Sequence, residues 1–228
     1  MPVMESESQH MQTERCRLVL ITPDIATVAD VAERLQRAVD AGDVASVIIP
    51  DWGMDEDQFQ DHAAALSKIA QEAGAASLIA GAPRVAARIG ADGIHVDGNR
   101  LELDDAIRQY QNRMIVGSGG ARTRDVALDL GEAQPDYMFF GRFGYDNTPE
   151  PHPRNITLGT WWAQMIEVPC IVMAGSDPAS IRTVAETGTE FVAASQIVFG
   201  SDVDAAEAVR NANNMLDQAA ASRTESES

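Results

Sequence analysis

Apolar residues along the chain alternate between short continuous runs and stripes in which every third or fourth residue is apolar. Leu18 to Ile21 and Val44 to Ile49 are continuous apolar runs, as expected for strands that are buried on both faces. Between them, residues 27–41 carry apolar side chains at the spacing of one helix face, and Gly42 then ends the helix. This part of the chain is therefore predicted to be a strand, a helix and a second strand.

The same alternation continues along the rest of the chain. A helix is predicted where Phe59, Ala63, Leu66 and Ala70 form an apolar stripe that ends at Gly74. Further strands are predicted near 76–80, 92–96, 113–117, 135–140, 168–173 and 190–194, and further helices over 82–89, 102–110, 122–131, 157–165, 177–187 and 202–219. About eight strand–helix units indicate parallel strands and favour a closed barrel over an open doubly wound sheet. The predicted fold class is α/β, a single (β/α)8 TIM barrel.

Both ends of the chain are polar and charged and lack the apolar spacing of a packed element. Residues 1–15 are predicted to be a disordered acidic tail, and residues 221–228 a second disordered tail. The barrel is expected to occupy residues 16–220 as one domain, because α/β barrels commonly contain roughly 200–250 residues.

Composition narrows the functional classes. No apolar run has the roughly 18 residues that a membrane span needs, and the acidic start lacks the features of a secretory signal. Two cysteines make neither a disulfide framework nor a zinc site, so the cytoplasm is the expected location. The net charge of −18 disfavours nucleic acids and anionic membranes as partners. The single lysine, Lys68, lies off the apolar stripe of its helix and is predicted to face solvent.

In a TIM barrel the chemistry lies at the carboxyl ends of the strands, so the residues around these ends are candidates. His95 and Arg142 are the candidate catalytic residues, His95 as a pocket acid or base and Arg142 as a bidentate ligand for phosphate. The alternative for His95, which we favour, is a packed and hydrogen-bonded histidine of the barrel. The alternative for Arg142 is a surface or ion-paired arginine.

Two groups of residues near the strand ends are predicted to bind a ligand. Backbone N–H groups and small polar side chains are predicted to bind phosphate at Gly119, Ala174, Gly175, Ser176, Ser195 and Gln196. A tight turn at Gly119 and a helix cap at Gln196 are the alternatives. Asp51, Trp52 and Asp97 are predicted to line a substrate pocket, in which an acid and an indole disfavour a diphosphate and suit an aromatic or cationic ligand. Trp52 packing on its loop and a turn role for Asp97 are the alternatives here.

The segment from Gly141 to Ile156 is long for a connection in a barrel and is rich in Pro, Gly and polar residues. Arg142, Tyr145, His152 and Arg154 all lie in it. Because long loops at the carboxyl ends of barrel strands often carry function, we expect the ligand specificity to reside there.

Four segments, in order along the chain, match motifs of one protein family. They are Leu18 to Pro23 (an opening strand), Gly90 to Val96 (G-A-D-G-V-H-L), Asp136-Tyr137 with Gly141 (A-D-Y-V-G-x-G-P), and Val168 to Gly175 (I-P-V-V-A-I-G-G). The chain resembles the thiamine-phosphate synthase/TenI family from about residue 17 to 215. The resemblance implies a (β/α)8 barrel linked to thiamine biosynthesis. The family's synthases join hydroxymethylpyrimidine diphosphate to thiazole phosphate with Mg²⁺ and release pyrophosphate.

The chain departs from the family's pattern at most positions that carry this chemistry. Pro50-Asp51-Trp52 stand in place of R-E-K, Ala80-Gly81 in place of N-D, Arg100 near the second magnesium aspartate, and Gly119-Gly120-Ala121 in place of S-x-H. Thr148 is the threonine that survives from a T-x-T-K loop, and the resemblance adds it to the substrate pocket. Residues 76–91 contain no Asp or Asn, so the usual magnesium site lacks its carboxylate and no metal site is predicted.

Three functions follow from these observations. The first is a divergent family member that binds a phosphorylated small molecule without the usual magnesium and diphosphate residues, either as a pseudoenzyme or with altered chemistry. The second is an active synthase, a transferase, in which Arg100, Arg122 and Arg142 supply positive charge and Asp97 or Asp146 holds Mg²⁺. Only this second function requires a cofactor. The third is a non-catalytic protein whose acidic surface binds a basic partner, and a homo-oligomer is compatible with all three.

Overall fold

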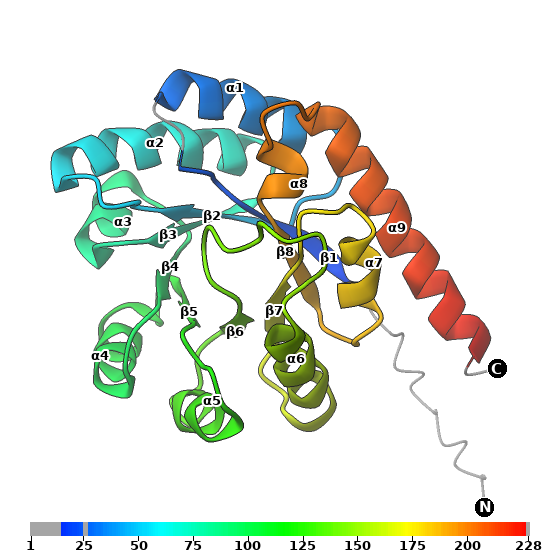
Figure 1. Cartoon of the computed structure of the whole chain (residues 1–228). Helices are drawn as coiled ribbons and strands as arrows, with labels where there is room; N and C mark the ends of the chain where they lie inside the picture. The colour runs from blue at the N-terminus through cyan, green and yellow to red at the C-terminus, as the bar shows by residue number, and fades with distance from the viewer. Residues whose placement is uncertain (1–14, 25–26, 227–228) are drawn as a thin grey trace, which may run out of the picture.

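The computed structural model describes residues 15–24 and 27–226, without the side chains of residues 224–226. The strands in this part of the chain are all parallel and pair in sequence order, and β8 pairs with β1 to close the sheet. They are β1 (Arg17–Ile21), β2 (Ser46–Pro50), β3 (Ala76–Ala80), β4 (Gly93–Val96), β5 (Ile115–Ser118), β6 (Tyr137–Phe140), β7 (Cys170–Met173) and β8 (Phe191–Ala194). This closed barrel, seen in Figure 1, confirms the predicted (β/α)8 fold class.

A helix follows each strand, and a long additional helix ends the described chain. The helices are α1 (Val28–Val39), α2 (Glu56–Glu72), α3 (Pro83–Ile89), α4 (Arg100–Tyr110), α5 (Arg124–Gly131), α6 (Pro153–Met165), α7 (Ser180–Ala185), α8 (Gln196–Phe199) and α9 (Ala205–Ser226). α9 packs against α1, α7 and α8 and so covers the side of the barrel where β1 meets β8 (Figure 1). Within the described ranges, no helix combines the length and the apolar character that crossing a bilayer requires.

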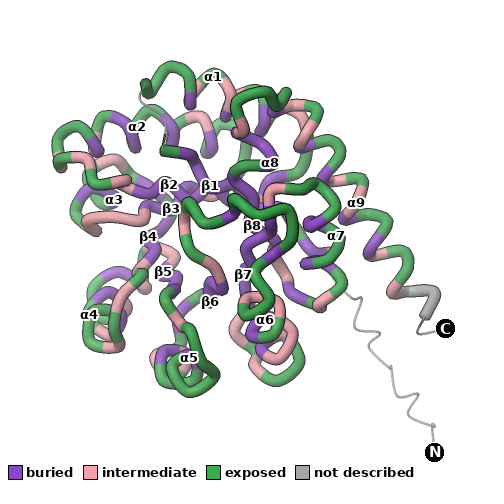
Figure 2. The backbone as a smooth tube through the Cα atoms, in the orientation of Figure 1, coloured by how far each residue is buried: buried purple, intermediate pink, exposed green. Residues whose placement is uncertain are grey.

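The strand residues alternate between two apolar clusters. Leu18 and Leu20 of β1 belong to the larger cluster, which includes residues of the surrounding helices, whereas Val19 and Ile21 belong to a smaller cluster of strand residues. Figure 2 shows the strands as buried and much of the outer faces of the helices as exposed. Because side chains fill the barrel interior, a ligand has to bind above it, at the ends of the strands.

The structure corrects the predicted boundaries of the barrel. α9 continues to Ser226, so the prediction of a disordered tail from residue 221 is wrong for residues 221–226. Arg15 also belongs to the barrel, because its guanidinium forms ion pairs with Asp43 and with Asp217 of α9. The predicted tail over residues 1–14 and the last two residues lie outside the described part of the chain.

The structure also shortens the long connection after β6. α6 begins at Pro153, whose missing N–H costs nothing in the first helical turn, and His152 caps the helix by accepting from the Arg154 N–H at 3.1 Å. Residues 153–156, predicted to belong to the loop, are therefore helical. The loop proper, residues 141–152, is called the β6–α6 loop below.

Candidate functional site

Three arginines converge on one cavity at the carboxyl ends of β5, β6 and β7. This cavity of about 480 Å³ is called the arginine pocket. Its lining includes Asp97, Arg122, Arg142, Thr148, His152 and Arg154. Arg122 comes from the segment after β5, Arg142 from the β6–α6 loop, and Arg154 from the first turn of α6.

These three guanidinium groups form no ion pair among the described residues, although Asp97 and Glu150 line the same cavity. Ion pairs among the described residues hold eight other arginines, but none of them includes Arg122, Arg142 or Arg154. Arg142 instead lies over the ring of Tyr145, with its guanidinium carbon 3.9 Å from the ring centroid. Unpaired arginines that share a cavity suit an anion such as phosphate, because a guanidinium donates two parallel hydrogen bonds to it.

A second cavity of about 840 Å³ adjoins the first above β2, β3 and β4 and is called the acidic pocket. Its lining includes the carboxylates of Asp51, Asp97, Glu102 and Asp105 and the rings of Trp52, Tyr110 and Phe143. The one arginine in this lining, Arg84, is already bound by Glu56, with a 2.6 Å contact between Nε and the carboxylate. The negative charge of the pocket is thus not balanced by a free cation of its lining.

Asp97 lines both cavities and is the residue that joins them. Partial burial raises the pKa of the Asp97 carboxyl, while the positive charges of Arg142 and Arg122 act in the opposite direction. The two arginines are therefore close enough to influence Asp97, although neither forms an ion pair with it.

His95 lies below the acidic pocket, in the barrel interior. Its side chain is 4% exposed, and its Nδ1 lies 2.9 Å from the phenol oxygen of Tyr137 on β6. Burial lowers the pKa of His95 to about 3, so the imidazole is neutral at physiological pH. The interpretation that the sequence favoured for His95 was a packed and hydrogen-bonded histidine. The Nδ1 atom fits it, because it is buried and contacts Tyr137.

The other ring nitrogen of His95, Nε2, is buried and unpartnered among the described residues. His95 contributes to the lining of the acidic pocket. A Cβ atom built on Gly119 would lie 2.8 Å from Nε2 and 3.3 Å from the Asp97 carboxylate. A larger residue than glycine at position 119 would therefore collide with the His95 ring and crowd the Asp97 carboxylate.

Trp52 has a conformation that is uncommon for a bulky side chain. Its φ angle is 48°, in the left-handed region, and its indole N–H donates to the Thr22 carbonyl oxygen at 3.1 Å. The β6–α6 loop covers the ring, because Gly144 lies against it. Strained backbone of this kind is common at ligand sites, where the surrounding structure holds it in place.

The backbone N–H groups predicted from the sequence as anion ligands are already bonded within the protein. Gly119 donates to the Val96 carbonyl, Ala174 to the Ala193 carbonyl, Gly175 to the Ser180 hydroxyl, and Ser176 to the Thr148 carbonyl, at 2.7–3.0 Å. The carboxylate of Asp146 accepts from the Gln196 N–H at 2.7 Å. An anion at this position has to displace these bonds, of which the β6–α6 loop supplies those to Ser176 and Gln196. This corrects the expectation of exposed N–H groups.

The structure separates the remaining candidates into those near the cavities and those away from them. Thr148 lines the arginine pocket, with its hydroxyl donating to the Glu150 carbonyl at 3.0 Å. Lys68 is exposed, as predicted, and it pairs with Glu72.

Sequence reasoning missed Tyr137 as the partner of His95, and Phe143 and Glu102 as parts of the acidic pocket. Strand alternation, which turns Tyr137 and Phe139 inward together, was the signal that could have found the first.

The family's magnesium site does not fit the residues present. Ala80 and Gly81 offer no carboxylate, and Arg100 is held by Asp104 of its own helix at 2.8 Å. In the described ranges, no three His, Cys, Asp or Glu side chains cluster closely enough to hold a metal ion. The synthase hypothesis assigns Asp146 as a possible magnesium ligand. Its carboxylate already accepts a hydrogen bond from the Gln196 N–H at the start of α8.

Comparison with known proteins gives the family directly. The thiamine monophosphate synthase family (TMP-TENI) matches residues 18–198. The thiamine-phosphate synthase of Rhodospirillum centenum is 31% identical over 202 residues, which cover 88% of this chain and 98% of that protein. The thiamine-phosphate synthase of Hyphomonas neptunium is 31% identical over 212 residues, covering 90% and 96% of the two chains.

A solved structure shows the same fold. The thiamine phosphate pyrophosphorylase of Pyrococcus furiosus superposes with a TM-score of 0.73 at 16% identity, covering 91% of this chain and 98% of that one. The family match extends over most of the barrel, and the two relatives cover nearly all of it. The chain therefore belongs to the thiamine monophosphate synthase family.

Proposed function

We propose that this family member binds a phosphorylated small molecule in the arginine pocket, without the magnesium and diphosphate chemistry of the family's synthases. The observation that carries the proposal is the convergence of Arg122, Arg142 and Arg154 on one cavity. The chain has a net charge of −18 and only one lysine, so three arginines that share a cavity and form no ion pair in the described part of the chain favour an anionic ligand. The family match favours a phosphate ester from thiamine metabolism as that ligand.

The arginine pocket replaces the site predicted at the strand-7 and strand-8 ends as our proposed position for the phosphate. Arg142 is the candidate for the bidentate phosphate contact, and Thr148 lies in the same lining. His95 is the candidate for contact with the rest of the ligand, through its unpartnered Nε2. Because the imidazole is neutral, it acts as a single hydrogen-bond donor or acceptor and supplies no charge.

An active thiamine-phosphate synthase is the second candidate function. Identity of 31% with proteins of that name, over most of the chain, is the observation that favours it. The synthase function requires the chain to join two phosphorylated substrates and to stabilise the diphosphate that leaves. Arg122 and Arg142 would supply the positive charge for this.

A non-catalytic interaction protein is the third candidate. A cytoplasmic location, the absence of nucleic-acid and membrane partners, and a homo-oligomer stay predictions.

Thermal-shift titrations test the proposal. The ligands are thiazole phosphate, hydroxymethylpyrimidine diphosphate, pyrophosphate and thiamine phosphate, each with and without Mg²⁺. A ligand at 100 times its Kd adds about 2.7 kcal/mol of stability, which is roughly 5–10 °C in Tm for a chain of this size. We expect a magnesium-independent shift with a monophosphate that is lost in Arg142→Gln and retained in the matched control Arg124→Gln.

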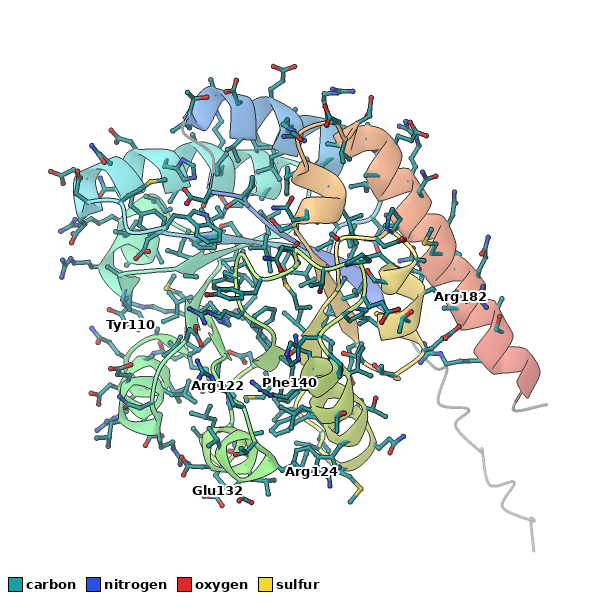
Figure 3. The ribbon with its side chains drawn as sticks, in the orientation of Figure 1. Tyr110, Arg122, Arg124, Glu132, Phe140 and Arg182 are labelled. Atoms are coloured by element: carbon teal, nitrogen blue, oxygen red, sulfur yellow. The ribbon has the colours of Figure 1, made fainter. Side chains whose placement is uncertain are left out.

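Arg124 is a suitable control because its guanidinium stacks on Trp161, 4.9 Å from the ring centroid, outside the arginine pocket. Figure 3 shows Arg122 on the barrel side of α5 and Arg124 farther out, toward α6. A magnesium-dependent shift with the diphosphate, together with formation of thiamine phosphate from both substrates, would establish the synthase function instead. If no phosphorylated compound shifts Tm, the proposal is wrong and the third candidate gains support.

A further inference from the structure

His152 lies where the β6–α6 loop meets α6, and it also contributes to the lining of the arginine pocket. The proposed function uses the arginines of this lining and gives His152 no role. The ring Nδ1 of His152 accepts a hydrogen bond from the Arg154 backbone N–H at 3.1 Å. An imidazole nitrogen accepts a hydrogen bond only through a free lone pair, so Nδ1 carries no proton. The ring proton is therefore on Nε2, which makes Nε2 a hydrogen-bond donor.

The backbone of the first turn of α6, residues 153–156, has no N–H group left for an anion. Pro153 has no N–H, and that of Arg154 is taken by the His152 ring. The N–H groups of Asn155 and Ile156 both donate to the His152 carbonyl oxygen, at 2.9 and 3.3 Å. An anion beside the start of this helix must consequently be bound by side chains, since the helix terminus is already satisfied.

The cap also holds the His152 ring in one orientation before any ligand binds. The side chain is exposed and lines the cavity, so an anion that enters the arginine pocket can reach it. A side chain that is already held loses little conformational entropy on binding, whereas each long arginine of the pocket loses more. A fixed N–H donor among flexible guanidinium groups therefore adds direction to a site in which the arginines supply the charge.

We propose that His152 binds the anion of the arginine pocket through its Nε2–H group while Nδ1 continues to cap α6. This inference rests on the proposed function, because it assigns a further ligand to the phosphate of that site. It also assigns the tautomer of the ring, since the proton stays on Nε2 for as long as Nδ1 accepts from Arg154. One side chain thus fixes the start of the helix and contributes a directed hydrogen bond to the ligand.

Nitrogen NMR of the histidine rings tests the tautomer and the contact in the natural full chain. In mildly alkaline buffer, where imidazoles are neutral, a long-range proton–nitrogen correlation spectrum distinguishes the protonated ring nitrogen from the unprotonated one. We expect the His152 ring to carry its proton on Nε2. Addition of thiazole phosphate, or of inorganic phosphate at higher concentration, should shift the Nε2 signal and leave the Nδ1 signal nearly unchanged. The signals that disappear in a His152 variant assign the residue.

Two variants separate the cap from the ligand contact. His152→Asn places an amide oxygen about where Nδ1 lies and has no group at Nε2, so it should keep Tm and raise the Kd for thiazole phosphate about tenfold, the effect of one hydrogen bond to a charged oxygen. His152→Gln places an amide N–H about where Nε2 lies and loses the cap, so it should lower Tm by about 2–4 °C and retain most of the affinity. Circular dichroism melts and isothermal titration calorimetry measure the two effects.

The outcomes separate the inference from the proposed function. If thiazole phosphate binds and depends on Arg142, but His152→Asn binds it as tightly as the natural chain does, the inference is overturned and phosphate binding in the arginine pocket stands. A proton on Nδ1, or an Nε2 signal that does not move when the phosphate binds, would overturn the inference without any variant. If no phosphorylated compound binds the natural chain, the proposed function falls and the inference falls with it.

Discussion

At the scale of single residues, glycine and histidine together shape the centre of the candidate site. His95 packs edge-to-face on Phe139, with ring centroids 5.5 Å apart, and contacts Tyr137 through Nδ1. These contacts hold the ring in one orientation and leave Nε2 buried without a partner among the described residues. Gly117, on β5 opposite His95, is required as well, because a Cβ there would overlap the Tyr137 ring.

Gly119→Ala is predicted to disturb His95. The added Cβ would stand 2.8 Å from Nε2, closer than real Cβ contacts, and must push the imidazole or the backbone aside. We expect a loss of about 1–3 kcal/mol in the free energy of unfolding and a changed NMR signal for the His95 ring. Urea denaturation and imidazole NMR measure the two effects.

Ser118→Ala is the control for this change, because it alters the neighbouring residue without adding volume. The Ser118 hydroxyl is buried and has no hydrogen-bond partner among the described residues. Its removal should leave stability unchanged or slightly higher. If Gly119→Ala is as stable as Ser118→Ala and the His95 signal does not move, Gly119 does not control the space beside His95.

At the scale of elements, the buried carboxylate of Asp146 helps to hold the β6–α6 loop to the rest of the barrel. Asp146 is 2% exposed, and one of its oxygens accepts from the Gln196 N–H while the other has no partner in the described part of the chain. Burial raises the pKa of Asp146. The loop also pairs with the segment after β7 through the Thr148 and Pro149 carbonyls, and it crosses the strand ends between β6 and β8 in Figure 1.

Asp146→Ala is predicted to loosen the β6–α6 loop without unfolding the barrel. The loop loses its contact with α8, while the barrel loses a buried charge that is costly to keep. Trypsin should cleave after Arg142 several times faster than in the natural chain, with Tm little changed. Asn147→Ala, an exposed neighbour, should cleave at the natural rate. Equal rates for the two variants would mean that Asp146 does not anchor the loop.

A second contact between elements joins β1 to the helix layer. Asp43 lies between Arg15 and Arg17, and Arg15 continues to Asp217 of α9. The hydrogen bond from Arg17 is the main cause that lowers the pKa of Asp43 below its ordinary value of 3.8. Because the folded pKa is lowered, this carboxylate stabilises the fold above the unfolded pKa, and the contribution is lost as pH falls through the folded value.

Asp43→Asn is therefore predicted to destabilise the chain at pH 7 by less than about 1 kcal/mol, since the pair is largely exposed and screened by solvent. The difference from the natural chain should shrink below pH 3.8 and vanish once Asp43 is protonated in both states. Urea unfolding at several pH values measures it. Asp40→Asn, an exposed acid in no ion pair of the described residues, should show no such trend. A difference that stays constant down to pH 2 would contradict the proposed cause.

At the scale of the whole molecule, net charge opposes the compact state. The chain carries −18, and most of its ion pairs are exposed, so their individual contributions are small. Repulsion among the excess carboxylates is long-ranged, and salt screens it over about 10 Å at 0.1 M. Screening should therefore help the folded state more than it weakens the ion pairs.

Tm is predicted to rise when sodium chloride is increased from 0.05 to about 0.5 M, because added salt shortens the screening length from above about 10 Å to below it. Differential scanning calorimetry without ligand measures the effect, and potassium chloride serves as the control for specific ion binding. A fall in Tm with both salts would mean that ion pairs outweigh the net repulsion.

The sequence by itself determined the fold and the regions that face the site. Helix and strand signals depend on spacing within about ten residues, so alternation alone gave the (β/α)8 class and the order of its elements. The same local signals placed the candidates at the strand ends. They failed at residues 221–226, where α9 continues beyond the apolar stripe, and at residues 153–156, where Pro153 begins α6.

Only the tertiary structure decided which groups meet. His95 and Tyr137 are 42 positions apart, and Asp146 and Gln196 are 50 apart, so no local pattern indicates either contact. Closure of the barrel brings Arg122, Arg142 and Arg154 to one cavity and Asp51, Asp97 and Glu102 to the next. Hydrogen bonds and charge interactions join residues that the fold brings close in space, whereas secondary-structure signals come from residues that are close in the sequence. That difference is why the sequence located the site but not its division into a positive and a negative half.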